Sequence, residues 1–313
     1  MMHYPKPPEE NLTTLVEFVL LGFADAPHLQ WFLFGLFFAI YMVILLGNGT
    51  ILMITKVDPN LHTPMYYFLG NFSFLEICYV STTLPRMLLN LATQRRNISL
   101  VACAAQMCFV LILGATECFL LAVMAYDRHV AICHPLHYPR LMNPKVCTQL
   151  VTGSWISGIP FQIGQTIQIF SVTFCGSNQI HHFFCDIPPI LGLACGEILV
   201  NEMMVYLGAM LFLFVPFLLI LISYSKIIST ILKLPSSTSR AKAFSTCSSH
   251  LAVVGLFFGS SIITYLRPKS DHSTETDKVL SLFYTILTPM FNPIIYTLRN
   301  KYVILALKKL FCK

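Results

Sequence analysis

The sequence reads VACAAQMCFVLILGATECFLLAVMAYDR from residue 101 to residue 128, with Glu117 as the only charged residue before Asp127. A helix of about 20 mainly apolar residues is long enough to cross a lipid bilayer. This stretch therefore predicts a membrane-spanning helix. Six further stretches have the same character, and together the predicted spans cover 29–55, 64–88, 101–128, 146–168, 202–225, 243–266 and 279–298.

The composition of the 313-residue chain agrees with a membrane protein. Hydrophobic residues make up 56% of the chain and charged residues 11%, whereas a soluble domain carries about 25% charged residues. Disorder and nucleic-acid binding both need long polar or charged tracts, so neither is expected. We predict an all-α membrane protein in which residues 1–313 form one seven-transmembrane helix bundle.

The basic residues indicate how the bundle lies in the membrane. If the N-terminus is outside, thirteen of the twenty Lys and Arg residues fall in the inner connections and tail and seven fall outside. Cytoplasmic loops of membrane proteins are enriched in Lys and Arg. Residues 1–26 are therefore expected to be extracellular, where Asn11-Leu-Thr13 can be glycosylated.

Four cysteines fall in the predicted outer segments: Cys103, Cys175, Cys185 and Cys195. An even number of cysteines in an oxidising compartment favours disulfides. Four cysteines allow three pairings, and the residues alone do not choose among them.

Several motifs occur in order on the seven predicted spans. They are MAYDRHVAIC at 124–133, PMFNPIIYTLRN at 289–300, KAFSTCSSH at 242–250, LHTPMYYFL at 61–69 and Gly47-Asn48. In this combination the chain resembles the odorant receptors, of the tetrapod type, within the rhodopsin-like G-protein-coupled class. The resemblance covers about residues 11–310.

The resemblance implies a receptor of the plasma membrane that binds a small volatile odorant. It would activate a heterotrimeric stimulatory G protein of the olfactory type and raise cAMP. It also implies the disulfides Cys103–Cys185 and Cys175–Cys195, and a switch made of Asp127, Arg128, Tyr224, His250, Asn292, Pro293 and Tyr296. Read physically, Arg128 at the membrane edge can instead be a cation that orients its helix.

Glu76 and Glu117 are the acidic residues deep inside predicted spans. A carboxylate near the bilayer centre costs about 2.5–3.5 kcal/mol, so each should face the interior and have a partner. With Asn48 and Asn292 they resemble the sodium site of this receptor class, although members usually have Asp at the position of Glu76. Sodium, a proton or a purely structural pair remain open, and no other cofactor is expected.

A ligand pocket is expected between the outer halves of the helices. Met107, Val110, Leu111 and Gly114 follow one helical face, and by resemblance this face points into the odorant pocket. The resemblance adds Ala115, Gly208, Phe212, Phe258, Ser261, Ile262, Tyr265 and Thr285. Amine receptors of this class carry an aspartate in place of Val110, so we expect a small, uncharged, mostly apolar ligand.

The C-terminal segment 300–313 is expected in the cytoplasm. Apolar residues share one face over 301–311, which predicts a short amphipathic helix on the membrane, with Cys312 as a candidate for palmitoylation. Two rival functions are a seven-helix transporter, for which the sequence shows no internal repeat, and a receptor of the same fold for a non-odorant molecule. Motifs of enzymes are not found in the chain, so we expect no enzymatic activity.

Overall fold

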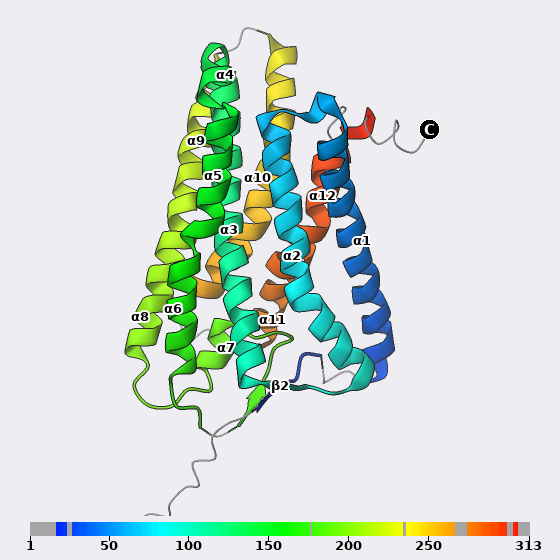
Figure 1. The fold of residues 1–313 in the computed structure, drawn as a ribbon, viewed down its shortest axis with the longest axis vertical. Helices are drawn as coiled ribbons and strands as arrows, with labels where there is room; N and C mark the ends of the chain where they lie inside the picture. The colour runs from blue at the N-terminus through cyan, green and yellow to red at the C-terminus, as the bar shows by residue number, and fades with distance from the viewer. Residues whose placement is uncertain are drawn as a thin grey trace, which may run out of the picture.

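The computed structural model describes residues 17–23, 27–175, 177–233, 236–266, 274–298 and 303–305. Long helices run along one common axis and form an elongated bundle (Figure 1). Asn11, Cys312 and most of the predicted amphipathic helix lie outside the described residues; within that helix, Val303–Leu305 is helical.

The first three long helices are α1 (Gln30–Val57), α2 (Pro64–Thr93) and α3 (Leu100–Cys133). Pro64 begins α2, where a residue without an N–H is tolerated. Gln94 ends α2 in the left-handed conformation with φ 58°. The Ser99 hydroxyl caps α3 by accepting a hydrogen bond from the Ala102 N–H at 3.3 Å.

The predicted span 146–168 consists of two helices, α5 (Pro144–Ser157) and α6 (Ile159–Phe170), which meet at Gly158. Pro160 lies in the first turn of α6 and cannot donate a backbone hydrogen bond to the preceding turn. A Cβ on Gly158 would lie 2.9 Å from the Cβ of Ala115. The glycine therefore lets this pair of helices approach α3 closely.

Two π-helical turns interrupt the remaining helices. One, η4 (Met210–Phe214), joins α8 (Leu199–Ala209) to α9 (Val215–Leu232). The other, η6 (Phe283–Leu287), joins α11 (Thr274–Leu282) to α12 (Thr288–Leu298). Each turn is followed directly by a helix with proline near its start, Pro216 and Pro289. Between these two units runs α10 (Ser237–Leu266).

Within the described residues, five helical segments are long and apolar enough to cross a membrane. They are Gln30–Val57, Leu100–Cys133, Leu199–Leu232, Cys247–Leu266 and Thr276–Ile295. The other two predicted spans are also helical, as α2 and as the α5–α6 pair, and lie beside these segments (Figure 1). The prediction of a helical membrane protein is therefore confirmed.

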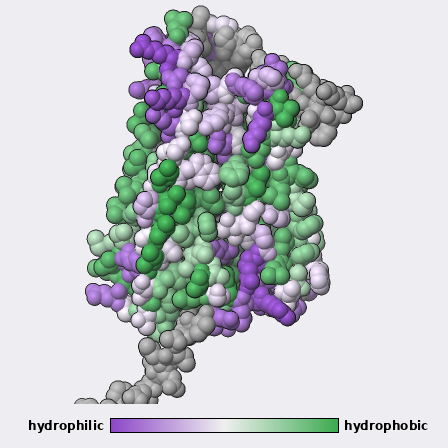
Figure 2. Space-filling model, in the orientation of Figure 1, coloured by the Kyte–Doolittle hydropathy of each residue, from purple (hydrophilic) through white to green (hydrophobic). Residues whose placement is uncertain are grey.

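Large apolar side chains face outward from the helices, among them Trp31, Phe109 and Val101. Hydrophobic surface covers the middle of the molecule in Figure 2, and most of the polar surface lies toward its two ends. A water-soluble protein rarely exposes apolar patches of this extent, whereas a lipid-facing surface requires them.

A small sheet closes the end of the bundle that carries the segment between α6 and α8. Its central strand is β1 (Glu17–Leu20), which pairs antiparallel with β2 (Asn97–Ser99) and parallel with β3 (Gln179–Ile180). Phe18 and Leu20 of β1 are buried there beside Cys103, Cys185 and Ile187. The sheet was not expected from the sequence.

Shorter elements complete the connections. They are η1 (Pro27–Leu29), η2 (Pro59–Leu61), η3 (Pro135–His137), α4 (Tyr138–Leu141) and α7 (Ile187–Leu191).

Candidate functional site

An inner cavity of about 70 Å³ lies between α3, α6, α8, η4, α10 and η6. Eight of the twelve predicted pocket residues line it: Val110, Leu111, Gly114, Ala115, Gly208, Phe212, Ser261 and Tyr265. Ten lining residues were not predicted: Tyr79, Cys118, Gln162, Gln165, Ile187, Val205, Ala209, Leu213, Phe257 and Tyr284.

The lining of the inner cavity is apolar with a few polar groups. None of the described residues that line it is Asp, Glu, Lys or Arg. Gln162 is buried, and its side-chain oxygen has no hydrogen-bond partner among the described residues. Because an unpaired buried acceptor is costly, this oxygen is a natural partner for a ligand that donates a hydrogen bond.

Two glycines shape the cavity in different ways. A Cβ on Gly208 would lie 2.9 Å from a ring carbon of Phe161, so the absence of a side chain lets α8 approach α6. A Cβ on Gly114 would meet nothing within 4 Å. Gly114 therefore contributes open space to the cavity, which a larger side chain at this position would fill.

The other four predicted pocket residues do not line this cavity. Met107 is buried with residues of the outer sheet and connecting segment. Phe258 packs on Phe217 with ring centroids 5.4 Å apart, and Ile262 packs against the main core. Thr285 is buried, and its hydroxyl donates to the Ser281 carbonyl oxygen at 2.5 Å.

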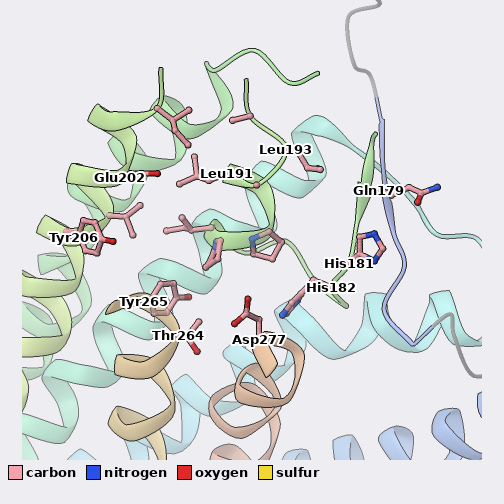
Figure 3. Close-up of a pocket in the computed structure, with 17 residues that line it drawn as sticks. Gln179, His181, His182, Leu191, Leu193, Glu202, Tyr206, Thr264, Tyr265 and Asp277 are labelled. Carbon is pink, nitrogen blue, oxygen red and sulfur yellow. The ribbon is translucent and has the colours of Figure 1, made fainter. Parts of the chain in front are cut away.

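A larger cavity of about 490 Å³, here called the vestibule, lies next to the inner cavity at the end of the bundle. Figure 3 shows Glu202 and Tyr206 on one side of it, Gln179, His181 and His182 on the other, and Thr264, Tyr265 and Asp277 between them. Ile187, Val205 and Tyr265 line both cavities. These three residues therefore stand between two adjoining cavities.

A buried carboxylate ties the connecting segment to the helices around the cavities. Asp186 accepts hydrogen bonds from the Tyr265 hydroxyl at 2.9 Å, the Tyr284 hydroxyl at 2.8 Å and the Ile187 N–H at 2.8 Å. Burial raises the pKa of Asp186 above its ordinary value, and these hydrogen bonds oppose the rise. Tyr265 was predicted from the sequence as a pocket residue, but its partner Asp186 was not.

His182 forms a second link in the same region. Its Nε2 lies 3.0 Å from the Ser281 hydroxyl oxygen of α11, and its Nδ1 lies 3.2 Å from the Phe184 carbonyl oxygen. The ring is fully enclosed, and burial lowers the pKa of His182 to about 3. The imidazole is therefore neutral at physiological pH.

The disulfides of this region are Cys103–Cys185 and Cys175–Cys195, with Cα atoms 5.5 Å and 5.9 Å apart. These are the two pairs that the resemblance implied. The first ties the connecting segment to the start of α3, and the second closes a loop within that segment.

A polar cluster lies in the middle of the bundle. Glu76 accepts a hydrogen bond from the Asn292 amide, and Glu117 is close enough to Glu76 to interact with it electrostatically. Several buried oxygens of this cluster have no hydrogen-bond partner among the described residues: Glu76 Oε2, both carboxyl oxygens of Glu117 and Asn292 Oδ1. The same is true of Asn48 Oδ1 on α1 and Ser73 Oγ on α2. Oxygen atoms of this kind suit a hard cation or a proton.

Four of the predicted switch residues lie toward the opposite end of the bundle: Asp127, Arg128, Tyr224 and His250. Arg128 donates to the Tyr224 hydroxyl at 3.3 Å, and that hydroxyl lies 2.9 Å from Nδ1 of His250. This chain of contacts joins α3, α9 and α10. Asp127 instead accepts a hydrogen bond from Tyr138 of α4 at 2.7 Å, a partner that the sequence did not indicate.

The last predicted switch residues lie on α12. Pro293 is inside this helix and packs against Gly47 of α1, where an added Cβ would lie 3.0 Å from the proline ring. The side chain of Tyr296 lies outside the described residues.

Comparison with known proteins assigns the family. The family model described as "Olfactory receptor" matches residues 37–313. Olfactory receptor 10AG1 of Homo sapiens is 62% identical over 95% of this chain and 99% of its own length. Olfactory receptor 10A7 of Homo sapiens is 52% identical, covering 96% of this chain and 95% of its own. The chain therefore belongs to the olfactory receptor family of G-protein-coupled membrane receptors, and its members are not enzymes.

Proposed function

We propose that the chain is an odorant receptor for a small, uncharged, mostly apolar volatile that binds in the inner cavity. The observation that carries this proposal is the lining of that cavity, in which apolar and aromatic side chains surround a few polar groups and the described part holds no charge. A charged ligand would have to leave water without a counter-ion. An uncharged volatile does not carry this cost.

The buried oxygen of Gln162 narrows the ligand chemistry further. Because this oxygen is without a partner among the described residues, a ligand hydroxyl can donate to it and remove the cost of leaving it unpaired. Ser261 offers a second polar contact from α10. We therefore expect alcohols to be preferred over ethers and hydrocarbons of the same shape.

The small volume of the inner cavity implies that it widens when a ligand binds. Ligand pockets usually measure about 300–1,000 Å³, whereas the inner cavity has about 70 Å³. The adjoining vestibule supplies about 490 Å³. We propose that the odorant enters through the vestibule and displaces the side chains that separate the two spaces, among them Val205 and Tyr265.

The signal would pass along α10. This helix carries Ser261 and Tyr265 beside the ligand and His250 beside Tyr224 and Arg128. A ligand that binds better to one arrangement of α10 shifts the receptor toward that arrangement. We propose that the His250 end then moves outward and admits a stimulatory G protein of the olfactory type, which raises cAMP.

The topology that fits this function has seven spans in a single domain over 1–313. The extracellular N-terminus lies at the vestibule end and the cytoplasm at the Arg128 end, in the plasma membrane. The distribution of basic residues in the sequence supports this orientation.

We also propose that the polar cluster around Glu76 and Glu117 holds sodium or a proton. The unpartnered oxygens of Asn48, Ser73, Glu117 and Asn292 would hold the ion, and a bound cation would supply positive charge that offsets the two carboxyl groups. Thermal stability of the purified receptor in NaCl and in KCl at equal ionic strength tests this. Stabilisation specific to Na⁺ that is lost in Glu117→Gln supports sodium, while equal stability in the two salts favours the proton.

The function is tested by cAMP accumulation in cells that express the chain with an olfactory-type G protein. The panel pairs small volatile alcohols with their methyl ethers. We expect a response to one or more alcohols that is absent in Arg128→Ala at equal surface expression. Gln162→Leu should lower the response to alcohols toward that of the ethers. Silence of the panel with verified surface expression would reject the proposed ligand class.

A further inference from the structure

A groove of about 560 Å³ runs along the outside of the bundle, away from both cavities described above. Its floor is α3, and its walls are α5 and α9, which both pack against α3. These helices lie next to one another in Figure 1. Several groove residues are exposed, including Tyr126, Gly153, Leu219 and Ile222. The groove is therefore open to the surroundings of the bundle and, in a membrane, to lipid.

The groove spans the depth of one leaflet. On α3 its lining extends from Phe119 to His129, a separation of ten positions that rises about 15 Å along a helix. The hydrocarbon core of a bilayer is about 30 Å thick. In the orientation proposed above, the groove runs from near the bilayer centre to the cytoplasmic edge.

The two ends of the groove differ in polarity. Phe119, Ala122 and Leu219 line the end near the bilayer centre. His129, Gln149 and Lys226 line the other end, and Lys226 interacts electrostatically with His129. Nδ1 of His129 has no hydrogen-bond partner among the described residues. Among the lining residues that the structure describes there is no Asp or Glu, so this end attracts an anion.

The hydroxyl groups along the groove do not require a polar ligand. Ser154 donates to the Leu150 carbonyl oxygen at 2.8 Å, Ser157 to that of Ser154 at 3.2 Å, and Ser223 to that of Leu219 at 2.8 Å. Each hydroxyl is thus satisfied within its own helix, as is common in apolar surroundings. The middle of the groove can therefore hold a hydrocarbon chain.

We propose that this groove binds an anionic phospholipid of the cytoplasmic leaflet, with an acyl chain between α5 and α9 and the headgroup at Lys226 and His129. The leaflet rests on the orientation in the proposed function, whereas the groove and its polarity do not. A phospholipid headgroup supplies the anion that the basic end lacks, and its acyl chain matches the apolar length of the groove.

Photocrosslinking of the full-length receptor tests this proposal. The purified receptor is reconstituted in phosphatidylcholine vesicles that contain a small fraction of one probe, which carries a photoreactive group on its hydrocarbon part. The probes are phosphatidylserine, phosphatidylcholine and, as a sterol, cholesterol. Mass spectrometry then locates the label. We expect phosphatidylserine to label peptides that contain 119–129, 149–157 and 219–226 about fivefold more than phosphatidylcholine does, because one basic residue near a membrane surface favours an anionic lipid by about this factor.

Two substitutions separate headgroup recognition from occupation of the groove. Lys226→Gln should reduce phosphatidylserine labelling to the level of phosphatidylcholine. Lys56→Gln changes a lysine in the last turn of α1, outside the groove, and should leave the labelling unchanged. Gly153→Leu should reduce labelling by both phospholipids, because a Cβ at Gly153 meets nothing within 4 Å and the new side chain can occupy the groove. Gly164→Leu is its control, because Gly164 is exposed on α6 and a Cβ there also meets nothing within 4 Å.

Three results would overturn the proposal: equal labelling by the two phospholipids, labelling by phosphatidylserine that survives Lys226→Gln, or preferential labelling of these peptides by cholesterol. The last would assign the groove to a sterol. Crosslinking needs neither odorant nor G protein. Lipid labelling of the groove in a receptor that is silent toward odorants would therefore keep this proposal while rejecting the proposed function.

Discussion

Acid should loosen the segment between α6 and α8 through His182. The folded-state pKa of His182 is about 3, against 6.5 for the free side chain. Below pH 6.5 an opened segment therefore takes up a proton that the closed segment cannot accept. The contribution of His182 to the stability of the closed segment is therefore complete well above pH 6.5 and is lost progressively as the pH falls toward 3.

The size of the effect follows from the two pKa values. Between pH 7 and pH 5, protonation of an opened His182 costs the closed segment about 2 kcal/mol, which is about a 25-fold increase in the opened population. The raised pKa of Asp186 acts in the opposite direction. Because this carboxyl group binds its proton more tightly in the closed segment, the closed segment gains stability as the pH falls. His182→Gln removes the first effect and keeps the second.

Hydrogen exchange of the backbone over residues 179–186, corrected for the intrinsic effect of pH on exchange, measures the opening. The wild type should lose about 25-fold more protection than His182→Gln between pH 7 and pH 5. His181→Gln changes the neighbouring residue, whose side chain is exposed, and should behave as the wild type does. Equal loss of protection in the wild type and His182→Gln would refute the assignment of the acid effect to His182.

Three further changes test the cavities and the packing of the bundle. Gly114→Leu should fill the inner cavity and abolish the odorant response in the cAMP assay at normal surface expression. Gly255→Leu, which also has open space at its Cβ, should keep the response. An unchanged response in Gly114→Leu would place the ligand elsewhere. Gly47→Leu forces a side chain against α12 and should cost about 1–3 kcal/mol of stability in thermal unfolding. Gly49→Leu is its control, because a Cβ at Gly49 meets nothing within 4 Å. Equal unfolding temperatures of the two variants would contradict the packing argument. Tyr265→Phe removes one donor from the buried carboxylate of the connecting segment and should increase hydrogen exchange there about fivefold; unchanged exchange would show that this hydrogen bond does not hold the segment closed.

The apolar stretches of the sequence predicted where the long helices lie, but not where they end. Span 243–266 was predicted, and α10 begins earlier, at Ser237. Side-chain apolarity indicates the part of a helix that lies in lipid, while backbone hydrogen bonds can continue the helix beyond it. The same reasoning missed the division at Gly158, because a close approach to α3 is a property of two segments far apart in the chain.

The inner cavity was predicted in part for a similar reason. Helical periodicity and the family motifs indicated residues of α3, α8, η4 and α10, eight of which line the cavity. Tyr79 and Ile187 were not predicted. They lie on α2 and α7, and which side of these helices faces the cavity depends on how the helices pack in the folded protein. Gln162 and Gln165 did leave a signal: two polar residues three positions apart within an apolar stretch share a helical face. Such a face has to be buried against other parts of the protein.

The small sheet sets an order of assembly for the receptor. Strand β1 at residues 17–20 pairs with residues 97–99 and 179–180. A chain made from its N-terminus therefore cannot complete this sheet until synthesis has passed residue 180, when α1 through α6 have already been made. Until then Phe18 and Leu20 lack the partners that bury them. Completion of the sheet thus marks a late stage in biogenesis, and we expect chains stopped before residue 180 to expose the apolar side chains of β1 to chaperones.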